Sequence, residues 1–490
     1  PVDFNGGTPL KRGNVRTARN GTAIGSLGRF GAVQMKLKRF LLRYFPPGII
    51  LEYHGISGDL ETKTIDLLDL APTTEVDSLV KKILSEEPLI HESTKDTLQK
   101  MIFKLMEKGS DSGSQRFTLF KILRGHELPL TSCIFSKAGS KIITGSLDRS
   151  CRVWETMTGE ELLVLNGHSG LIYAMAFNNP FGDKIATGSF DRMARLWDAT
   201  TGECLHTLKG HRKEITCVSF NHLSTILATG SADYSIKLWD VEVGLQIRSL
   251  EGHSGEISSL CFNGDGQKLL TASFDNTAKI WEVTRGRCLS TLSGHGSEIK
   301  QKQLQEGHRG YLSVARFDFT DTYCLTASLD GTCKLWKANR GLCLDTLRGH
   351  NVDKNGKPDK NHIHPVLDAC FNSSGRRLAS SSSDGTAVIY ALRPNAEAEV
   401  SATVLCRLVG HEKEVSKVQF SPNGQRLLTA SADKTCRLWS MTGVCLQVLE
   451  GHGDEILNCT FNYDGDCIIT GSKDNTCRVW RDATLAMEDQ

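Results

Sequence analysis

Histidine, hydroxyl and aspartate side chains recur together along this 490-residue chain, and enzymes use such groups for nucleophilic catalysis. In one instance His253 is followed by Thr271 and Asp275, and Trp281 comes six positions after the aspartate. The same order recurs in eight units. An active site needs one such group, whereas a group present in every unit of a repeat is a rule of construction. The sequence therefore predicts a structural role for these residues and no catalytic residue.

The elements that must position these residues are short strands. The Gly-His pairs recur mostly every 41 to 43 residues, which is the period of a four-stranded propeller blade. Residues 253–281 hold three short apolar runs separated by Gly, Asp and Asn turns, and residues 287–292 supply a fourth strand. The run 117–123 precedes the first Gly-His pair, and the last unit ends at Trp480 without an outer strand. Pairing these two would close a ring of eight blades and remove two sheet edges.

This motif resembles the WD40 family, which implies a hydrogen-bonded relay from the histidine through the hydroxyl and the aspartate to the tryptophan. An unsatisfied buried polar group costs about 1 to 3 kcal/mol, so each member needs its partners. In the sixth unit either His350 or His362 completes the set, and Tyr390 replaces the tryptophan. The relay residues are His126, Thr144, Asp148, Trp154, His168, Thr187, Asp191, Trp197, His211, Thr229, Asp233, Trp239, His253, Thr271, Asp275, Trp281, His308, Thr326, Asp330, Trp336, Ser380, Asp384, Tyr390, His411, Thr429, Asp433, Trp439, His452, Thr470, Asp474 and Trp480.

The chain divides into five parts. Residues 1–34 lack a hydrophobic period and are expected to be a disordered leader or extension. Residues 35–110 predict a small, mainly helical α+β domain, because two apolar stripes have helical spacing and two β-rich runs flank a turn. Within it, Ser93 and Asp96 have capping-box spacing, and Lys36, Lys38, Arg39 and Arg43 could form a basic helix face. Residues 111–116 form a linker, 117–481 the propeller and 482–490 a tail.

Two polar insertions interrupt the repeat, near residues 296–308 and 351–362. We expect surface loops at both places, and a duplicated stretch remains an alternative for the first. A smaller insertion lies at 395–400.

Composition excludes several function classes. With 58 basic and 56 acidic residues the net charge is +2, so no global charge favours nucleic acid or a membrane. No apolar run approaches the roughly 20 residues that span a bilayer. The 16 cysteines fall on repeat positions and are expected to be buried thiols in a reducing compartment. No phosphate-binding loop, nucleophile elbow or zinc-spaced cluster is present, so we expect no enzyme activity, cofactor or metal.

A closer resemblance rests on MKLKRFLLRYFPPGIILEY, TKTIDLLDLAPTTEVDSLV and the last unit, LEGHGDEILNCTFNYDGDCIITGSKDNTCRVWR. These segments resemble the family of dynein assembly factors with WD repeats, which are outer-dynein-arm adaptors of intraflagellar transport. The resemblance runs from about Met35 to Arg481. It implies an adaptor that links preassembled outer-arm dynein to intraflagellar transport trains, in the cytoplasm, at the base of the cilium or flagellum and in the axoneme. A small GTPase as releasing factor stays open.

The alternative function is a substrate receptor of a cullin-type ubiquitin ligase or another WD40 scaffold. Such receptors typically carry a Trp-Asp-x-Arg signature, and none of the seven tryptophans is followed by arginine at the required place. The sequence therefore favours the adaptor.

Partner-binding residues are expected where the family's propellers present side chains beside the b–c turns. These positions predict an apolar patch centred on blades 1 and 2 and extended by blades 4 and 5, with acidic flanks. A second candidate is a groove between the two domains, because domain junctions often bind ligands. The candidate residues are Leu147, Leu171, Tyr173, Phe190, Phe274, Tyr311 and Leu329 in the patch, Glu214, Glu256, Glu414 and Glu455 at its flanks, and Arg43, Tyr44 and Phe45 at the groove.

Overall fold

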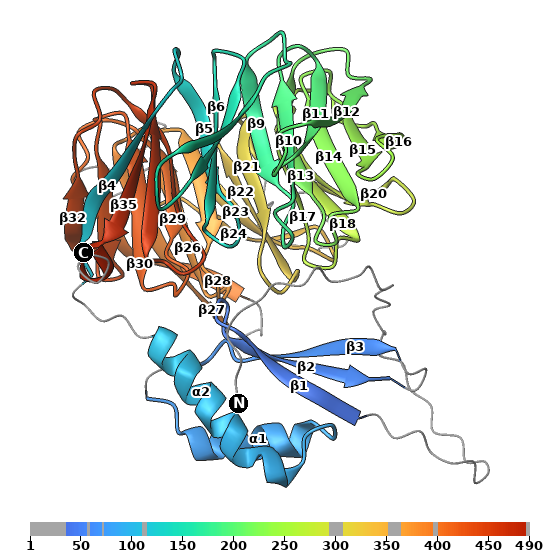
Figure 1. Cartoon of the computed structure of the whole chain (residues 1–490), viewed down its shortest axis with the longest axis vertical. Coiled ribbons are helices and arrows are strands. Elements are labelled where there is room, and N and C mark those ends of the chain that lie inside the picture. Colours follow the sequence, from blue (N-terminus) through green and yellow to red (C-terminus); the bar gives the residue numbers. More distant parts are fainter. Residues whose placement is uncertain are drawn as a thin grey trace, which may run out of the picture. The chain divides into compact units, whose positions relative to one another are not determined.

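The computed structural model forms two compact units, residues 1–110 and 111–490, which we describe separately (Figure 1). The structure describes residues 36–55, 59–70, 73–109, 115–293, 307–350, 364–394 and 400–486. The predicted leader 1–34, most of both large insertions and His362 lie outside these ranges.

The first unit packs two helices on one small sheet. Strands β1 (Lys36–Arg43), β2 (Gly48–His54) and β3 (Leu60–Asp66) form an antiparallel sheet in the order β1-β2-β3. Helices α1 (Val76–Glu86) and α2 (Lys95–Gly109), with a 3-10 turn η1 (Glu92–Thr94) between them, follow. Their apolar stripes pack with Ile49 and Leu51 of β2 in one buried core. The apolar residues of the two helices recur at helical spacing because they line the helix faces that pack on the sheet.

Two local expectations for this unit were wrong. The segment from Lys36 to Arg43 is a strand and not a basic helix face, because its backbone pairs with β2 in register from Lys36↔His54 to Arg43↔Gly48. Ser93 lies inside the 3-10 turn, so it does not cap α2. A tertiary strand pairing overrode a local pattern that also fits a helix.

The second unit contains eight four-stranded antiparallel sheets, here called blades 1 to 8, with strands a to d in each. Blades 1 to 4 are built as follows: blade 1 from β5 (Leu130–Phe135), β6 (Lys141–Ser146), β7 (Cys151–Glu155) and β8 (Glu161–Leu165); blade 2 from β9 (Ile172–Phe177), β10 (Lys184–Ser189), β11 (Met193–Asp198) and β12 (Cys204–Lys209); blade 3 from β13 (Ile215–Phe220), β14 (Ile226–Ser231), β15 (Ile236–Asp240) and β16 (Gln246–Leu250); blade 4 from β17 (Ile257–Phe262), β18 (Lys268–Ser273), β19 (Ala278–Glu282) and β20 (Arg287–Leu292).

Blades 5 to 8 continue the pattern. Their strands are β21 (Leu312–Phe317), β22 (Tyr323–Ser328), β23 (Cys333–Lys337) and β24 (Leu342–Leu347) in blade 5; β25 (Val366–Phe371), β26 (Arg377–Ser382), β27 (Thr386–Pro394) and β28 (Val400–Val409) in blade 6; β29 (Val415–Phe420), β30 (Arg426–Ser431), β31 (Cys436–Ser440) and β32 (Cys445–Leu449) in blade 7; and β33 (Ile456–Phe461), β34 (Cys467–Ser472), β35 (Thr476–Asp482) and, from the start of the unit, β4 (Phe117–Arg124) in blade 8. These sheets confirm the predicted eight-bladed all-β fold with a small N-terminal α+β unit.

The ring closes where β4 pairs with β35, from Thr476↔Arg124 to Asp482↔Phe117. A four-residue helix, α3 (Ala483–Ala486), follows β35, and the Ala483 N–H donates to the Arg116 carbonyl at 2.7 Å. The two ends of the propeller sequence therefore stabilise each other within one sheet.

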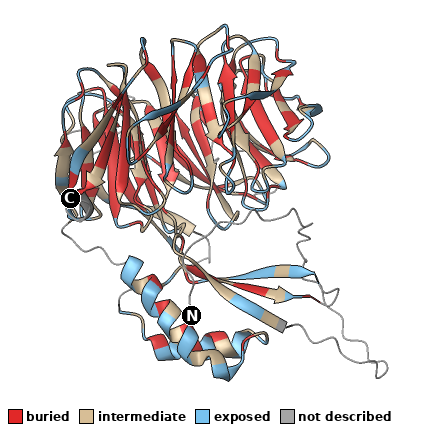
Figure 2. Ribbon diagram, viewed as in Figure 1, coloured by how far each residue is buried: buried red, intermediate tan, exposed pale blue. Residues whose placement is uncertain are grey.

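The propeller core lies between neighbouring blades (Figure 2). Trp281 of blade 4, for example, packs in one buried cluster with Leu238 and Leu250 of blade 3. Hydroxyl groups in strand a also bind the next blade: Thr131 donates to the Ile172 carbonyl at 2.7 Å and Ser416 to the Ile456 carbonyl at 2.7 Å. Each blade is thus buried against its neighbours and leaves its turns exposed.

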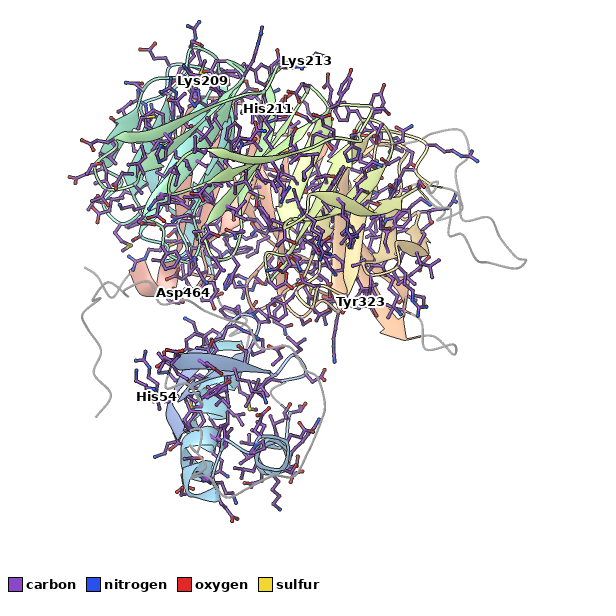
Figure 3. The ribbon with its side chains drawn as sticks, turned by 90° about the vertical axis from the view of Figure 1, so that its right-hand side faces the viewer. His54, Lys209, His211, Lys213, Tyr323 and Asp464 are labelled. Atoms are coloured by element: carbon purple, nitrogen blue, oxygen red, sulfur yellow. The ribbon has the colours of Figure 1, made fainter. Side chains whose placement is uncertain are left out.

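The antiparallel order places two kinds of loop on two opposite faces. The b–c turns and the segments that enter strand a form what we call the upper face, and the a–b and c–d turns form the lower face. Figure 3 shows His211 and Lys213, which precede β13, at one edge of the propeller, and Asp464, in an a–b turn, and Tyr323, the first residue of β22, at the opposite edge. Side chains on these two faces can therefore contact different partners.

Candidate interaction surface

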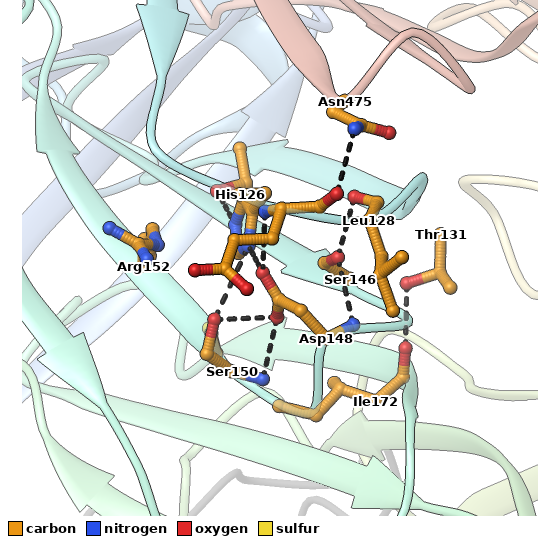
Figure 4. Close-up of polar contacts among 12 residues, drawn as sticks. His126, Leu128, Thr131, Ser146, Asp148, Ser150, Arg152, Ile172 and Asn475 are labelled. Carbon is orange, nitrogen blue, oxygen red and sulfur yellow. Dashed lines mark hydrogen bonds and ion pairs between the residues drawn. The ribbon is translucent and has the colours of Figure 1, made fainter.

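The repeated polar residues form one buried network in each blade, which blade 1 illustrates (Figure 4). His126 Nδ1 lies 2.7 Å from Asp148 Oδ2, and His126 Nε2 lies 2.9 Å from Thr144 Oγ1. Trp154 Nε1 donates to the same hydroxyl at 2.8 Å. Because a carboxylate accepts and an indole N–H donates, the histidine carries its proton on Nδ1 and the threonine hydroxyl donates to Nε2. Every polar group of the relay then has a partner.

Six other blades repeat this geometry. Their His Nε2 to Thr Oγ1 distances are 2.8 to 2.9 Å, and their Trp Nε1 to Thr Oγ1 distances are 2.8 to 3.0 Å. The histidine and aspartate side chains are 2.7 to 3.0 Å apart in these blades. The structure thus brings together the residues that the resemblance placed in a relay.

Blade 6 differs from the other seven. His350 Nε2 lies 2.8 Å from Ser380 Oγ, but its Nδ1 is 3.4 Å from Asp384, and Tyr390 Oη is 3.5 Å from Ser380 Oγ. Arg407 Nη2 donates to Asp384 at 2.6 Å. Of the two histidines that the sequence left open, His350 is the one found in the site. An ion pair from strand d therefore supplements a looser relay.

The electrostatics of the relay favour an ionised aspartate beside a neutral histidine. Burial would raise the pKa of the relay aspartates, but hydrogen bonds from the histidine, the backbone and a neighbouring hydroxyl outweigh it and lower the pKa, to about 2 for Asp384. Burial lowers the pKa of four relay histidines despite the adjacent carboxylate; these are His126, His168, His308 and His411. A buried hydroxyl held by two partners is a structural element and a poor nucleophile.

The relay aspartate also fixes the b–c turn on the upper face. Asp191 Oδ1 accepts the Met193 N–H at 2.9 Å, and its Oδ2 accepts the Ser169 N–H at 3.0 Å. In addition, Phe190 N–H donates to the Leu171 carbonyl at 3.1 Å, and corresponding bonds recur in the other blades. The backbone next to each candidate binding residue is therefore held independently of that residue's side chain.

The upper face of blades 1 to 5 carries exposed apolar side chains. Tyr173 and Phe190 have ring centroids 5.7 Å apart, and Phe274 of blade 4 stacks on Tyr311 of blade 5 at 4.9 Å. Tyr173 is 51% and Tyr311 is 52% exposed although each contacts another ring. Leu147 and Leu329 are also exposed, whereas Leu171 is half-buried.

Two further apolar residues of this face were missed by the sequence analysis. Leu128 in blade 1 and Tyr234 in blade 3 are exposed, and Lys213 Nζ lies 5.3 Å from the centre of the Tyr234 ring. Tyr234 gives blade 3 an exposed apolar side chain between those of blades 2 and 4. It follows the turn aspartate, whereas Leu147, Phe190, Phe274 and Leu329 precede theirs. We call the resulting set the upper half ring: Leu128, Leu147, Tyr173, Phe190, Tyr234, Phe274, Tyr311 and Leu329.

The charges beside the upper half ring are mainly basic. Glu214 and Glu256 are half-buried, while Glu414 and Glu455 lie on blades 7 and 8, where Glu455 binds Lys473. Exposed bases follow the relay histidine or the turn aspartate in blades 1, 2, 3 and 5; they are Arg149, Arg192, Arg212, Lys213 and Arg309, whereas Glu127 of blade 1 is an exposed acid directly after His126. In the sequence these basic residues can be found one or two positions after the relay histidine or the turn aspartate.

Arg43, Tyr44 and Phe45 lie where β1 turns into β2 in the first unit. Arg43 Nε donates to the Pro46 carbonyl at 2.8 Å, its Nη2 binds Asp66, and Tyr44 packs against the unit's own core. These contacts stabilise the hairpin. A role at a groove between the units stays a prediction.

Neither a metal centre nor a membrane span is found in the described part of the chain. No group of three or more His, Cys, Asp or Glu side chains there is arranged to hold a metal ion. No helix among the described residues is long and apolar enough to cross a bilayer.

Comparison with known proteins agrees with the repeat. The family model of the WD domain, G-beta repeat, matches residues 117–155, 159–198, 202–240, 244–282, 299–337, 341–390, 402–440 and 443–481. Among solved structures, the crystal structure of the computationally designed Ika8 protein is similar with a TM-score of 0.60 and 26% identity, over 74% of this chain and 99% of that chain.

Curated relatives match over a shorter stretch. The chain is 56% identical over 148 residues to dynein assembly factor with WD repeat domains 1 of Xenopus laevis and 51% identical to that of Homo sapiens, in each case 30% of this chain and 35% of the relative. It is 34% identical over 149 residues to the guanine nucleotide-binding protein subunit beta of Nicotiana tabacum, 30% of this chain and 36% of that protein. The matched region spans about a third of the length of these relatives.

Proposed function

The chain belongs to the WD40 repeat family, and from that premise we propose that it is a non-catalytic adaptor linking preassembled axonemal outer-arm dynein to intraflagellar transport trains. The observation that carries the proposal is the identity of 50 to 56% over 148 residues with proteins named dynein assembly factors. The more distant match, to a guanine nucleotide-binding protein subunit, is 34% identical over a stretch of similar length. The dynein-related relatives are therefore the better guide to function.

The upper half ring is the surface we assign to one partner. Its side chains are exposed although they are large and apolar, and the relay holds the backbone beneath them, so they are arranged for contact without being needed for folding. Aromatic residues at the centre of a patch supply most of the energy in many protein interfaces. The surrounding bases favour a partner segment that combines apolar anchors with carboxylates.

The proposal places the protein in the cytoplasm and at the base of the cilium or flagellum, where cargo and transport trains meet. A small GTPase as releasing factor is part of the same hypothesis and needs its own test. The similarity of the chain to proteins named dynein assembly factors supports a binding role over catalysis.

The test is affinity capture from ciliated cells with the full chain as bait. We expect both outer-arm dynein subunits and transport-train subunits with the unmodified chain, and loss of one class with Phe190→Ser combined with Tyr311→Ser. Val444→Ser is the matched control, because Val444 is 59% exposed but lies outside the upper half ring. Recovery of neither class by the unmodified chain refutes the adaptor function. Equal recovery by all three proteins refutes the upper half ring as the binding surface.

A further inference from the structure

A second group of exposed apolar side chains lies on the lower face of blades 2 and 3. Phe181 is 61% exposed in the a–b turn of blade 2, and Leu223 occupies the a–b turn of blade 3. Val243 and Leu245 follow in the c–d turn of blade 3, and Leu245 is 66% exposed. We call these four residues the lower patch.

Hydrogen bonds join the turns of the lower patch to one another. Ser224 Oγ donates to the Asn179 carbonyl at 3.1 Å, which joins the a–b turns of the two blades. Val241 N–H donates to the Thr225 carbonyl at 3.0 Å, which joins the a–b and c–d turns of blade 3. His206 of β12 donates from Nε2 to the Glu242 carbonyl at 2.9 Å. The four apolar residues therefore belong to one continuous surface.

The lower patch concentrates four exposed apolar residues in two adjacent blades, whereas blades 1, 5 and 7 each expose a single one in these turns, namely Met157, Phe319 and Val444. The position of Leu223 is occupied in blades 4, 6, 7 and 8 by residues that suit a turn, Asp265, Ser374, Asn423 and Asp464, and in blades 1 and 5 by the small residues Ala138 and Thr320. The position of Val243 is occupied elsewhere by Thr158, Thr201, Arg285 and Arg340. Since the repeat can form these turns with polar residues, folding does not require the apolar ones. Their clustering in two adjacent blades points to binding.

The charges around the lower patch indicate what kind of partner it fits. Asp183 and Glu242 are exposed on turns of the lower patch, and Glu203 is exposed on the c–d turn of blade 2. Lys184 is half-buried and its Nζ binds Asp183 at 3.0 Å, and Lys137 in the a–b turn of blade 1 lies near His222, so three carboxylates stand against two ammonium groups. The remaining ionisable group of these turns is His222, whose pKa is lowered by burial and by Lys137, so it is neutral at pH 7. The rim is therefore acidic, in contrast to the basic surroundings of the upper half ring.

We propose that the lower patch is a docking site for a basic amphipathic segment of a second protein, one that presents apolar anchors on one side and lysine or arginine on the other. Aliphatic and aromatic anchors would cover Phe181, Leu223 and Leu245, and the basic side chains would face the carboxylates of the rim. This inference rests on the lower face alone and does not depend on the identity of any dynein or transport partner. With the upper half ring it gives the propeller two binding surfaces of opposite charge on opposite faces.

The test uses the full chain and two synthetic amphipathic peptides of about five helical turns. Both peptides share one Leu/Phe face, and the polar face is lysine in one and glutamate in the other. We expect fluorescence anisotropy to show binding of the lysine peptide, weakened by salt, and little binding of the glutamate peptide. Combining Phe181→Ser with Leu245→Ser should weaken binding about tenfold or more, which corresponds to about 1.4 kcal/mol.

Control variants distinguish binding at this site from nonspecific hydrophobic binding. Val444→Ser removes a side chain of similar exposure from the equivalent turn of blade 7 and should leave the affinity unchanged. Circular dichroism should show that every variant keeps the melting temperature of the unmodified chain. Reversing the rim with Glu203→Lys and Glu242→Lys should transfer the preference to the glutamate peptide.

Four results would overturn the proposal. They are equal binding of the two peptides, an equal loss with Val444→Ser, a loss with the upper-face variant Phe190→Ser, and a concentration-dependent dimer in sedimentation velocity that Leu245→Ser abolishes. The last would show that a second copy of this chain occupies the lower patch.

Discussion

The relay allows a direct comparison of what one buried hydroxyl contributes in two neighbouring blades. In blade 5, Thr326 Oγ1 contacts both His308 Nε2 and Trp336 Nε1 at 2.8 Å. In blade 6, Ser380 Oγ contacts His350 Nε2 at 2.8 Å, whereas Tyr390 Oη is 3.5 Å away. The first hydroxyl makes two good hydrogen bonds and the second makes one.

Thr326→Val and Ser380→Ala each delete the hydroxyl and keep the rest of the side chain. Thr326→Val leaves an indole donor and an imidazole acceptor buried without their partner, and each costs about 1 to 3 kcal/mol, so we expect a loss of about 2 to 6 kcal/mol. Ser380→Ala strands one such group, and we expect about 1 to 3 kcal/mol. The first loss is a large fraction of the free energy of unfolding of an ordinary domain, about 5 to 15 kcal/mol.

Thermal unfolding followed by circular dichroism measures the overall loss, and hydrogen exchange of peptides from blades 5 and 6 locates it. Thr403→Val is the control: its hydroxyl is exposed on β28, and we expect a change within about 0.5 kcal/mol. If Ser380→Ala destabilises the propeller as much as Thr326→Val, the number of relay hydrogen bonds does not determine the contribution of the hydroxyl, and the argument fails.

Three other predictions concern pH, turn geometry and thiols. Burial lowers the pKa of several relay histidines, so as the pH falls the unfolded chain takes up protons before the folded chain does. The melting temperature should therefore fall between about pH 8 and about pH 5.5, beginning near the ordinary histidine pKa of 6.5. A rise in the melting temperature would contradict this. Gly244 and Gly182 both have left-handed φ, 74° and 68°, but a Cβ at Gly244 would lie 2.5 Å from the His206 ring and one at Gly182 would meet nothing within 4 Å. Gly182→Ala should cost about 1 to 2 kcal/mol in denaturant unfolding and Gly244→Ala clearly more, so equal costs would refute the clash. Iodoacetamide should modify Cys204 and Cys288 of the native protein first, because these two thiols are exposed and the others are at least partly buried. Mass spectrometry can follow the labelling, and early modification of a buried thiol would contradict the packing.

The repeat made most of the propeller predictable from the sequence. The period, the turn aspartates and the tryptophans fix strand positions locally, and the incomplete first and last units indicate how the ring closes. The same argument fails where the repeat is interrupted. His350 and His362 lie at the two ends of a long polar insertion, and the sequence left the choice open although His362 has the spacing of the other units, 28 residues before the aromatic position. His350, three residues after the end of β24, lies in the site.

Contacts between elements were not predictable. Arg407 reaches Asp384 because β28 pairs with β27 in a register that a preceding insertion hides. The strand β1 has apolar residues at spacings that a helix also allows, and its pairing with β2 decides the outcome. Tyr234 was missed because the residue after the turn aspartate has the same left-handed backbone in most blades but is polar or glycine elsewhere, as at Arg149, Arg192 and Asn276.

Stability and binding are carried by different atoms of the same turns, and this separation makes the function testable by point variants. At the b–c turn of blade 2, Asp191 and the carbonyl of Leu171 hold the backbone, while the ring of Phe190 contacts Tyr173 and solvent. Removing the Phe190 ring leaves every backbone hydrogen bond in place, so the fold should persist with little change in melting temperature. A loss of partner in such a variant therefore reports on the interface, whereas a loss in a relay variant such as Thr187→Val reports on the blade. A propeller of eight similar blades can in this way change its exposed turn residues blade by blade, as the contrast between the basic surroundings of the upper half ring and the acidic rim of the lower patch illustrates.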